Sequence, residues 1–195
     1  MAKIFYIMGK SAAGKDCVFR EMRNYFPQLK NIILYTTRPR RCGEVDGEDY
    51  YFVSEEERDA MLADGKIIES RSYDTIHGDW HYFTADDGQF DENYDYIGIG
   101  TLTSYLALEG HLSHFSLIPI YVEVEDGERL QRAINREKKQ REPKYLELCR
   151  RYIADQDDFS EANLQNAGIT KRFVNDFRER CGSEIRDFIQ SQLDE

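Results

Sequence analysis

The sequence has few cysteines, the residues that crosslink small secreted folds and build structural metal sites. It has four cysteines in 195 residues, and no two of them form a C-x-x-C pair. Such scattered cysteines are typical of reduced thiols rather than of disulfides or a zinc site. The four are Cys17, Cys42, Cys149 and Cys181.

Long apolar runs are also absent from the sequence. No segment approaches the about 18 apolar residues of a membrane span, and the apolar start of the chain is shorter than a secretory h-region. We therefore expect a cytoplasmic protein that does not contact a membrane. The histidine pairs His77/His81 and His111/His114 lack the cysteines or carboxylates that would complete a metal site, so we expect no metal there.

Positive charge is scarce in this chain. Lys and Arg number 26 against 37 Asp and Glu, which gives a formal net charge of -11. Binding to a nucleic-acid polymer depends on broad neutralisation of phosphates, so we expect no such partner. Two basic clusters, at 36–41 and 129–144, stand out against this acidic background as places for a small phosphate ligand.

A glycine-rich loop follows the first apolar run of the chain. Gly9, Gly14 and Lys15 have the spacing of G-x-x-x-x-G-K-[ST], with Asp16 in place of the hydroxyl residue. In that motif backbone N–H groups wrap phosphates and the lysine reaches the outer two. The alternative is an ordinary strand-to-helix turn with an exposed lysine. The predicted phosphate-binding residues are Gly9, Lys10, Ser11, Ala12, Ala13, Gly14, Lys15 and Asp16.

Strand-like and helix-like segments alternate in the outer parts of the chain, as in a parallel sheet covered on both faces. Strands are predicted at 4–8, 31–36, 94–100, 116–124 and 173–175, and helices after Lys15 and at 101–109, 126–139, 143–159 and 183–193. Residues 37–90 differ, because they combine a capping-box helix at 55–63 with a hairpin formed by 66–73 and 80–84. This stretch is predicted to be an insertion with its own small sheet.

The helix predicted at 126–139 has a basic face. Arg129, Arg132, Arg136 and Lys139 recur at three- and four-residue spacing and therefore share one side of the helix. Such a stripe is either a solvated surface or a binding site for an anion, since like charges repel unless something negative lies between them. Arg141, Arg150 and Arg151 follow closely and favour the second interpretation.

A longer pattern gives the chain a resemblance to a known family. Residues 36–54 read T-T-R-P-x-R-x-G-E-x-x-G-x-D-Y-x-F-x-S, and Ile67-Ile68-Glu69 follows in order. With the glycine loop, the chain resembles guanylate kinases over nearly its whole length. The resemblance implies an α/β, P-loop nucleoside-monophosphate-kinase-like fold of three layers. It would have a parallel five-stranded core sheet with helices on both faces, a small mixed or antiparallel acceptor-binding insertion, and a helical lid.

The resemblance further implies one domain and a set of site residues. The core would comprise about 1–36, 93–125 and 160–195, the insertion about 37–92, and the lid about 126–159. The residues implied to act in catalysis are Lys15, Arg132, Arg136 and Arg151, with Asn175 beside the adenine of ATP. The residues implied to bind the acceptor nucleotide are Arg38, Arg41, Tyr50, Glu69, Tyr82 and Thr84, of which Glu69 would accept from the guanine N1 and N2 donors.

The implied activity is ATP-dependent phosphoryl transfer to a nucleoside monophosphate, above all GMP or dGMP. A phosphate with a second pKa of about 6 is largely dianionic near neutral pH, so the acceptor oxygen needs no general base. The implied cofactors are ATP and Mg²⁺, with Asp16 as a direct or water-mediated ligand of the metal. Without the metal this carboxylate would repel phosphates, so we expect nucleotide binding to depend strictly on Mg²⁺. The number of subunits stays open.

Three departures from the family pattern concern the acceptor pocket. Leu34 and Tyr35 replace serines of typical members, Gly98 and Gly100 replace aspartates, and Phe83 replaces a glycine. They leave open a kinase for a different small phosphorylated acceptor. A catalytically inactive interaction module of the same fold is a further alternative, opposed by the retained glycine loop and lid arginines.

Overall fold

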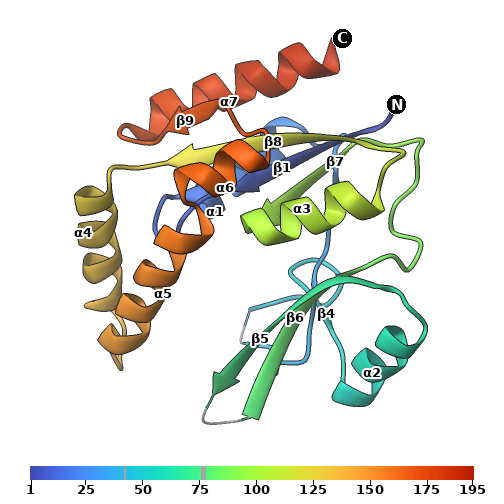
Figure 1. Ribbon diagram of the computed structural model, residues 1–195, viewed down its shortest axis with the longest axis horizontal. Helices are drawn as coiled ribbons and strands as arrows, with labels where there is room; N and C mark the ends of the chain where they lie inside the picture. Colours follow the sequence, from blue (N-terminus) through green and yellow to red (C-terminus); the bar gives the residue numbers. More distant parts are fainter. Residues whose placement is uncertain (42, 76–77) are drawn as a thin grey trace.

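The computed structural model describes residues 1–41, 43–75 and 78–195, so Cys42 and His77 lie outside the described residues. Its core is a five-stranded sheet in the order β2-β7-β1-β8-β9, and every pair of neighbours is parallel (Figure 1). The strands are β1 (Lys3–Met8), β2 (Lys30–Asn31), β7 (Tyr96–Gly100), β8 (Ser116–Glu123) and β9 (Arg172–Val174). The predicted parallel core sheet is thus confirmed.

Alternate residues of the buried strand β1 supply the two faces of this core. Phe5 and Ile7 pack on one face, which is covered by α1 (Lys15–Tyr25) and α7 (Arg178–Leu193). Tyr6 and Met8 pack on the other face, which is covered by α3 (Leu102–His111) and α6 (Glu161–Asn166). The short helix α6 was not predicted, because only Leu164 among its residues is buried and no apolar period marks it.

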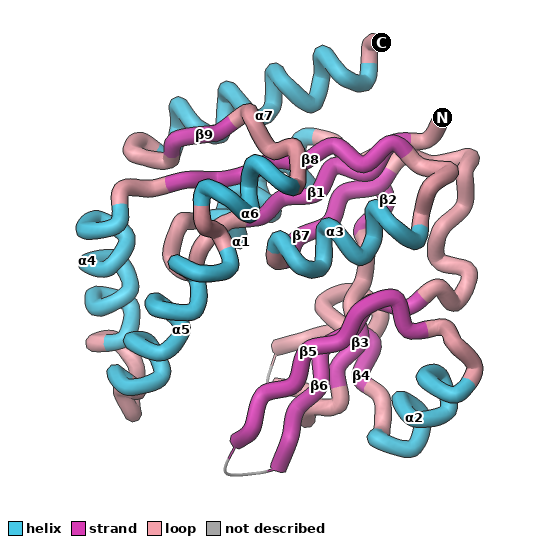
Figure 2. Tube along the Cα trace, viewed as in Figure 1, coloured by secondary structure: helices cyan, strands magenta, loops and turns pink. Residues whose placement is uncertain are grey.

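A separate four-stranded sheet lies below the core sheet in the view of Figure 2. Its order is β4-β3-β6-β5, with β3 parallel to β4 and antiparallel to β6, so the predicted small mixed sheet is present. The strands are β3 (Tyr35–Thr36), β4 (Tyr51–Phe52), β5 (Ile67–Thr75) and β6 (Gly78–Ala85). Helix α2 (Glu55–Ala63) begins with the predicted capping box between Ser54 and Glu57.

The single strand predicted at 31–36 was wrong. Residues 30–31 form β2 at the edge of the core sheet, and β3 belongs to the second sheet. Between them the backbone N–H of Ile33 donates to the Gln89 side chain, and the Leu34 carbonyl accepts from Tyr51. The apolar run is therefore the crossing from one sheet to the other, where side-chain and cross-sheet partners replace a continuous ladder.

Helices α4 (Asp126–Glu137) and α5 (Tyr145–Asp158) pack on each other and project from the core, as Figure 1 shows. In the part of the chain that the structure describes, Cys17, Cys149 and Cys181 are free thiols, and no group of three metal-ligating side chains occurs. None of the helices within the described ranges is long and apolar enough to cross a membrane.

Candidate functional site

The glycine loop lies between β1 and α1, as its spacing predicts. A side chain at Gly9 would overlap the carbonyl oxygen of Val122 on β8, and one at Gly14 would overlap the Asn175 amide. Gly14 also has a φ of +94°, a conformation that favours glycine. Helix α1 begins at Lys15, directly after the loop, so its N-terminal N–H groups are available to an anion held there.

Asn175 fixes the position of this loop. The residue is buried, and its side-chain amide donates to the Ala13 carbonyl at 2.8 Å. Its backbone N–H donates to the Glu123 carbonyl at 2.8 Å, which ties the end of β9 to β8. Asn175 thus positions the glycine loop, and its contact with adenine stays a prediction.

The surroundings of Lys15 would be stabilised by an anion from outside the protein. Burial lowers the pKa of the Lys15 ammonium, while the carboxylates of Asp16 and Asp155 act in the opposite direction. The guanidinium groups of Arg151 and Arg136 lower the Lys15 pKa further. Three cationic groups that disfavour one another's charge are stabilised together by a multiply charged phosphate.

The loop is also bound to helices α4 and α5, the predicted lid, by a buried network that the sequence did not predict. Asp155 on α5 accepts from the backbone N–H of Ser11 at 2.7 Å. Arg129 on α4 is 1% exposed, and its Nη1 donates to both Asp155 and the Ser11 carbonyl at 3.3 Å. The guanidinium lies 3.9 Å from the ring centre of Tyr152. Arg129 is therefore neither a solvated cation nor free for an anion, the two alternatives for the basic face, but is buried between α4, α5 and the glycine loop.

Replacing Arg129 with alanine is expected to lower the free energy of unfolding by about 3–5 kcal/mol, because it leaves the Asp155 carboxylate without its buried cation. Urea unfolding followed by circular dichroism measures this change. The control is Arg132→Ala, which removes a half-exposed ion pair with Glu128 and should cost less than about 1 kcal/mol. Equal midpoints for the two variants would contradict the structural role of Arg129.

Two of the three predicted lid arginines meet at one cavity beside the loop. Arg136 and Arg151 line a cavity of about 180 Å³ together with Ser11 and Lys144. Arg151 Nη2 lies 3.3 Å from the Ser11 hydroxyl. Arg132 does not line this cavity, and its Nε donates to Glu128 at 2.9 Å. The structure thus brings Arg136 and Arg151 together at the loop and turns Arg132 to a neighbouring acid.

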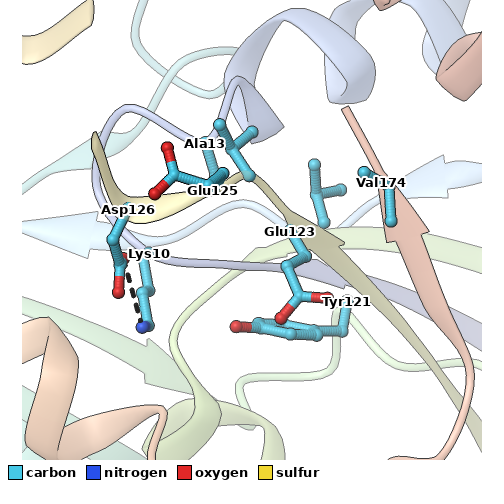
Figure 3. Close-up of a pocket in the computed structure, with 9 residues that line it drawn as sticks. Lys10, Ala13, Tyr121, Glu123, Glu125, Asp126 and Val174 are labelled. Atoms are coloured by element: carbon cyan, nitrogen blue, oxygen red, sulfur yellow. Dashed lines mark hydrogen bonds and ion pairs between the residues drawn. The ribbon is translucent and has the colours of Figure 1, made fainter. Parts of the chain in front are cut away.

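A second cavity, of about 310 Å³, lies where β8 and β9 end beside the loop (Figure 3). Carboxylates from Glu123, Glu125 and Asp126 line it, as do the apolar side chains of Ala13 and Val174. Figure 3 also shows the ion pair between Lys10 and Asp126, 3.5 Å long. This acidic and partly apolar lining suits a neutral ring with hydroxyl groups better than it suits a phosphate.

A second predicted anion-binding group, centred on Arg38, lies beside the other sheet. Arg38 is 3% exposed, its Nε donates to the Tyr82 hydroxyl at 3.1 Å, and its guanidinium lies 5.1 Å from the ring centre of Tyr50. Glu44 accepts from Nη1 at 2.8 Å and from Nη2, and this pairing holds the pKa of the Glu44 carboxyl at about 2. The exposed Arg41 donates its backbone N–H to the same carboxylate. Glu44 therefore fixes the guanidinium that we predict to grip the acceptor phosphate.

Glu69 and Thr84 lie opposite each other on β5 and β6. Thr84 donates its hydroxyl to Glu69 Oε1 at 2.8 Å, whereas Glu69 Oε2 is buried without a hydrogen-bond partner in the described residues. Three of the predicted acceptor residues, Glu69, Tyr82 and Thr84, therefore lie on neighbouring strands of the second sheet. An unsatisfied buried carboxylate oxygen is costly, so a donor from a ligand is expected there.

Two of the departures from the family pattern pack against each other. Tyr35 stacks on Phe83 with ring centres 5.1 Å apart and contacts Tyr51 at 4.7 Å. The Tyr35 hydroxyl donates to Asp87. Both side chains are buried, so their first effect is to build the small hydrophobic core of the second sheet.

The glycine loop and the Arg38 group are close enough to interact electrostatically. Burial is the main cause of the raised pKa of the Tyr50 phenol, and Tyr82 raises it further. The Asp16 carboxylate, at the end of the glycine loop, also raises the Tyr50 pKa. The end of the glycine loop is thus within electrostatic range of the Arg38 group.

Comparison with known proteins gives similarity to one family. The family model described as guanylate kinase matches residues 1–81. A guanylate kinase of Syntrophotalea carbinolica is 43% identical over 75 residues, which is 38% of this chain and 34% of that protein. One from Thermosynechococcus vestitus is 45% identical over 67 residues, or 34% of this chain and 35% of that protein.

The sequence matches therefore span about a third of the length of these curated relatives. The crystal structure of a guanylate kinase from Anaplasma phagocytophilum matches over 98% of this chain and 86% of its own, with a TM-score of 0.64 and 17% identity. The fold is therefore shared along the chain, while sequence similarity is concentrated in the part that holds the glycine loop and the Arg38 group.

Proposed function

We propose that this chain, which is similar to guanylate kinases over residues 1–81 and shares their fold, transfers a phosphoryl group from ATP to a nucleoside monophosphate, GMP or dGMP first of all. The observation that carries the proposal is the pair of anion-binding groups. The loop with Lys15 is one, and the Arg38 cluster, whose Tyr50 responds to the Asp16 charge, is the other. A reaction between two phosphates requires such an arrangement.

On the acceptor side the protein positions an oxygen that is already a nucleophile. Arg38, held by Glu44 and Tyr82, presents a preorganised guanidinium to the acceptor phosphate, and Arg41 is the exposed cation beside it. Glu69, oriented by Thr84, accepts from the base. No general base is needed, so these residues act by binding and orientation.

On the donor side the loop N–H groups and Lys15 hold the β- and γ-phosphates. Arg136 and Arg151, which line the cavity beside Ser11, spread the charge that develops on the transferred group. Closure of α4 and α5 over the loop excludes water that would otherwise hydrolyse ATP. The larger cavity, with acidic groups for ribose hydroxyls and Val174 for the ring, receives the adenosine.

The residues present fit Mg²⁺ as a metal held mainly by the nucleotide. Asp16 is an exposed carboxylate next to Lys15, and this metal commonly takes one or two carboxylates together with phosphates and water. When bound, Mg²⁺ supplies neutralisation of the donor phosphates. Asp16 would hold it directly or through water.

Removing Mg²⁺ with EDTA is expected to weaken ATP binding by about tenfold or more, because the Asp16 carboxylate then faces the phosphates without a cation between them. Isothermal titration calorimetry measures the dissociation constant with and without the metal. In Asp16→Asn the ratio of the two constants should fall toward unity. Equal ATP affinity in the two conditions for the unaltered protein would refute this prediction.

The proposed activity is tested by a panel of nucleoside monophosphates with Mg-ATP, in which the formation of diphosphates is followed by chromatography. GMP and dGMP are expected to be converted fastest. If another phosphorylated acceptor is converted and GMP is not, the proposed acceptor is wrong. The departures from the family pattern in the acceptor pocket are the reason for testing several acceptors. Absence of ATP binding would favour the interaction module instead.

A further inference from the structure

Tyr6 places a buried hydroxyl at the end of the core sheet where the family pattern has carboxylates. The residue lies on β1 directly beside Gly98 of β7. A Cβ atom at Gly98 would lie 2.8 Å from the Tyr6 ring, and one at Gly100 would overlap the Tyr6 hydroxyl. The phenol therefore occupies the volume that two aspartate side chains would need, and it replaces two negative charges with one neutral group.

The Tyr6 hydroxyl is unsatisfied in its surroundings. The residue is 1% exposed, and its oxygen has no hydrogen-bond partner among the described residues. Burial raises the pKa of the Tyr6 phenol and the Glu69 carboxylate raises it further, whereas Arg71 and the nearby Ser104 hydroxyl act in the opposite direction. The phenol therefore keeps its proton at neutral pH and is available as a donor.

The neighbouring Glu69 has a buried acceptor oxygen without a hydrogen bond. Its residue is 9% exposed and its Oε2 lacks a hydrogen-bond partner, although Arg71 Nε approaches that oxygen at 3.3 Å. Strand β5, which carries Glu69, packs against α3, and α3 covers the same face of the core as Tyr6. An acceptor and a donor that are both buried without a hydrogen bond of good geometry are therefore within electrostatic range of each other, and a ligand that bonds to both would be stabilised there.

Two residues of β6 connect the Tyr6 and Glu69 pair with the Arg38 group. Thr84, which holds Glu69, is two residues from Tyr82, which holds Arg38. Side chains two residues apart on a strand share one face and are separated by roughly 7 Å. That separation is of the order of the distance from the phosphate of a nucleotide to its base.

We propose that Tyr6 is a specificity-determining residue that donates its hydroxyl to the 6-oxo group of the acceptor purine. This inference rests on the proposed function. The 6-oxopurine edge of guanine presents the O6 acceptor beside the N1–H donor, which matches a phenol O–H beside a carboxylate. Adenine offers an amino group and an unprotonated N1 at these places, so Glu69 would find no donor at N1.

The test compares Tyr6→Phe with unaltered protein, using GMP and 6-thio-GMP, whose sulfur is a weak acceptor. Tyr6→Phe is expected to raise the KM for GMP about 10- to 100-fold with little change in the KM for ATP. The preference for GMP over 6-thio-GMP should narrow by about tenfold. The control is Tyr105→Phe, which removes a hydroxyl from the same cluster that donates to Glu109 at 3.1 Å, and it should keep the preference.

An unchanged preference in Tyr6→Phe, or an equal rise of both KM values, would overturn the assignment. The variant should fold, because the change removes an unpaired buried hydroxyl and leaves the ring in place. Calorimetric binding of GMP separates this proposal from the proposed activity. A protein that binds GMP through Tyr6 but forms no diphosphate refutes the kinase alone, and one that binds no GMP refutes the role of Tyr6.

Discussion

Lys15→Met is expected to reduce kcat/KM by about 10³-fold, because it removes the cation closest to the transferred phosphate. A steady-state coupled assay measures the loss. Burial and the neighbouring arginines Arg136 and Arg151 lower the pKa of Lys15, so its charged form is disfavoured in the folded, unliganded protein. At neutral pH that charge costs folding free energy, and stability would rise as the pH passed the lowered pKa and the charge was lost.

The same reasoning separates a functional defect from a folding defect. The melting temperature of unliganded Lys15→Met should equal or exceed that of the unaltered protein, whereas its increase on adding Mg-ATP should vanish. Lys30→Ala is the matched control, since Lys30 lies at the edge strand β2 and its ammonium contacts the Tyr94 ring. A retained Mg-ATP shift in Lys15→Met would contradict the role of this lysine.

The elements that could be predicted from the sequence are those specified by local patterns. The glycine loop, the capping box of α2 and the antiparallel pair of β5 and β6 each follow from neighbouring residues, and the structure contains all three. The break between β2 and β3 was missed, because it depends on Gln89 and Tyr51 supplying partners from distant parts of the chain. Residues 31–36 alone have the pattern of an ordinary strand.

The site was predictable to the same extent. Gly14, Lys15 and Arg38 lie in motifs with fixed spacing, but the clamp of Arg129 and Asp155 on Ser11 joins residues far apart in sequence. Helical spacing places Arg129 on the same side of its helix as Arg132. It does not show that Arg129 is buried against a carboxylate on another helix. Tyr6 has the same limitation, because its role depends on glycines in the adjacent strand.

Arg38→Ala is expected to lower kcat/KM for the acceptor by about 10²- to 10³-fold, mainly through KM, because a charge-assisted contact with the acceptor phosphate is lost. The KM for ATP should change little, since Arg38 follows β3 of the second sheet and the glycine loop follows β1 of the core sheet. Initial rates with each substrate varied separately measure the two constants. Arg38→Lys should recover little of the loss, because an ammonium cannot reproduce the planar contacts with Glu44 and Tyr82.

Arg40→Ala is the matched control, because Arg40 is an exposed arginine of the same loop and its loss should leave both KM values nearly unchanged. Arg38→Ala also frees Glu44, whose carboxyl pKa should return from about 2 toward its ordinary value of 4.5. The stabilisation from this ion pair is present above pH 4.5 in the unaltered protein and is lost as the pH falls toward 2. The difference in melting temperature between the two proteins should therefore shrink across that interval. A constant difference, or an equal defect in Arg40→Ala, would show that Arg38 acts through something other than this preorganised pair.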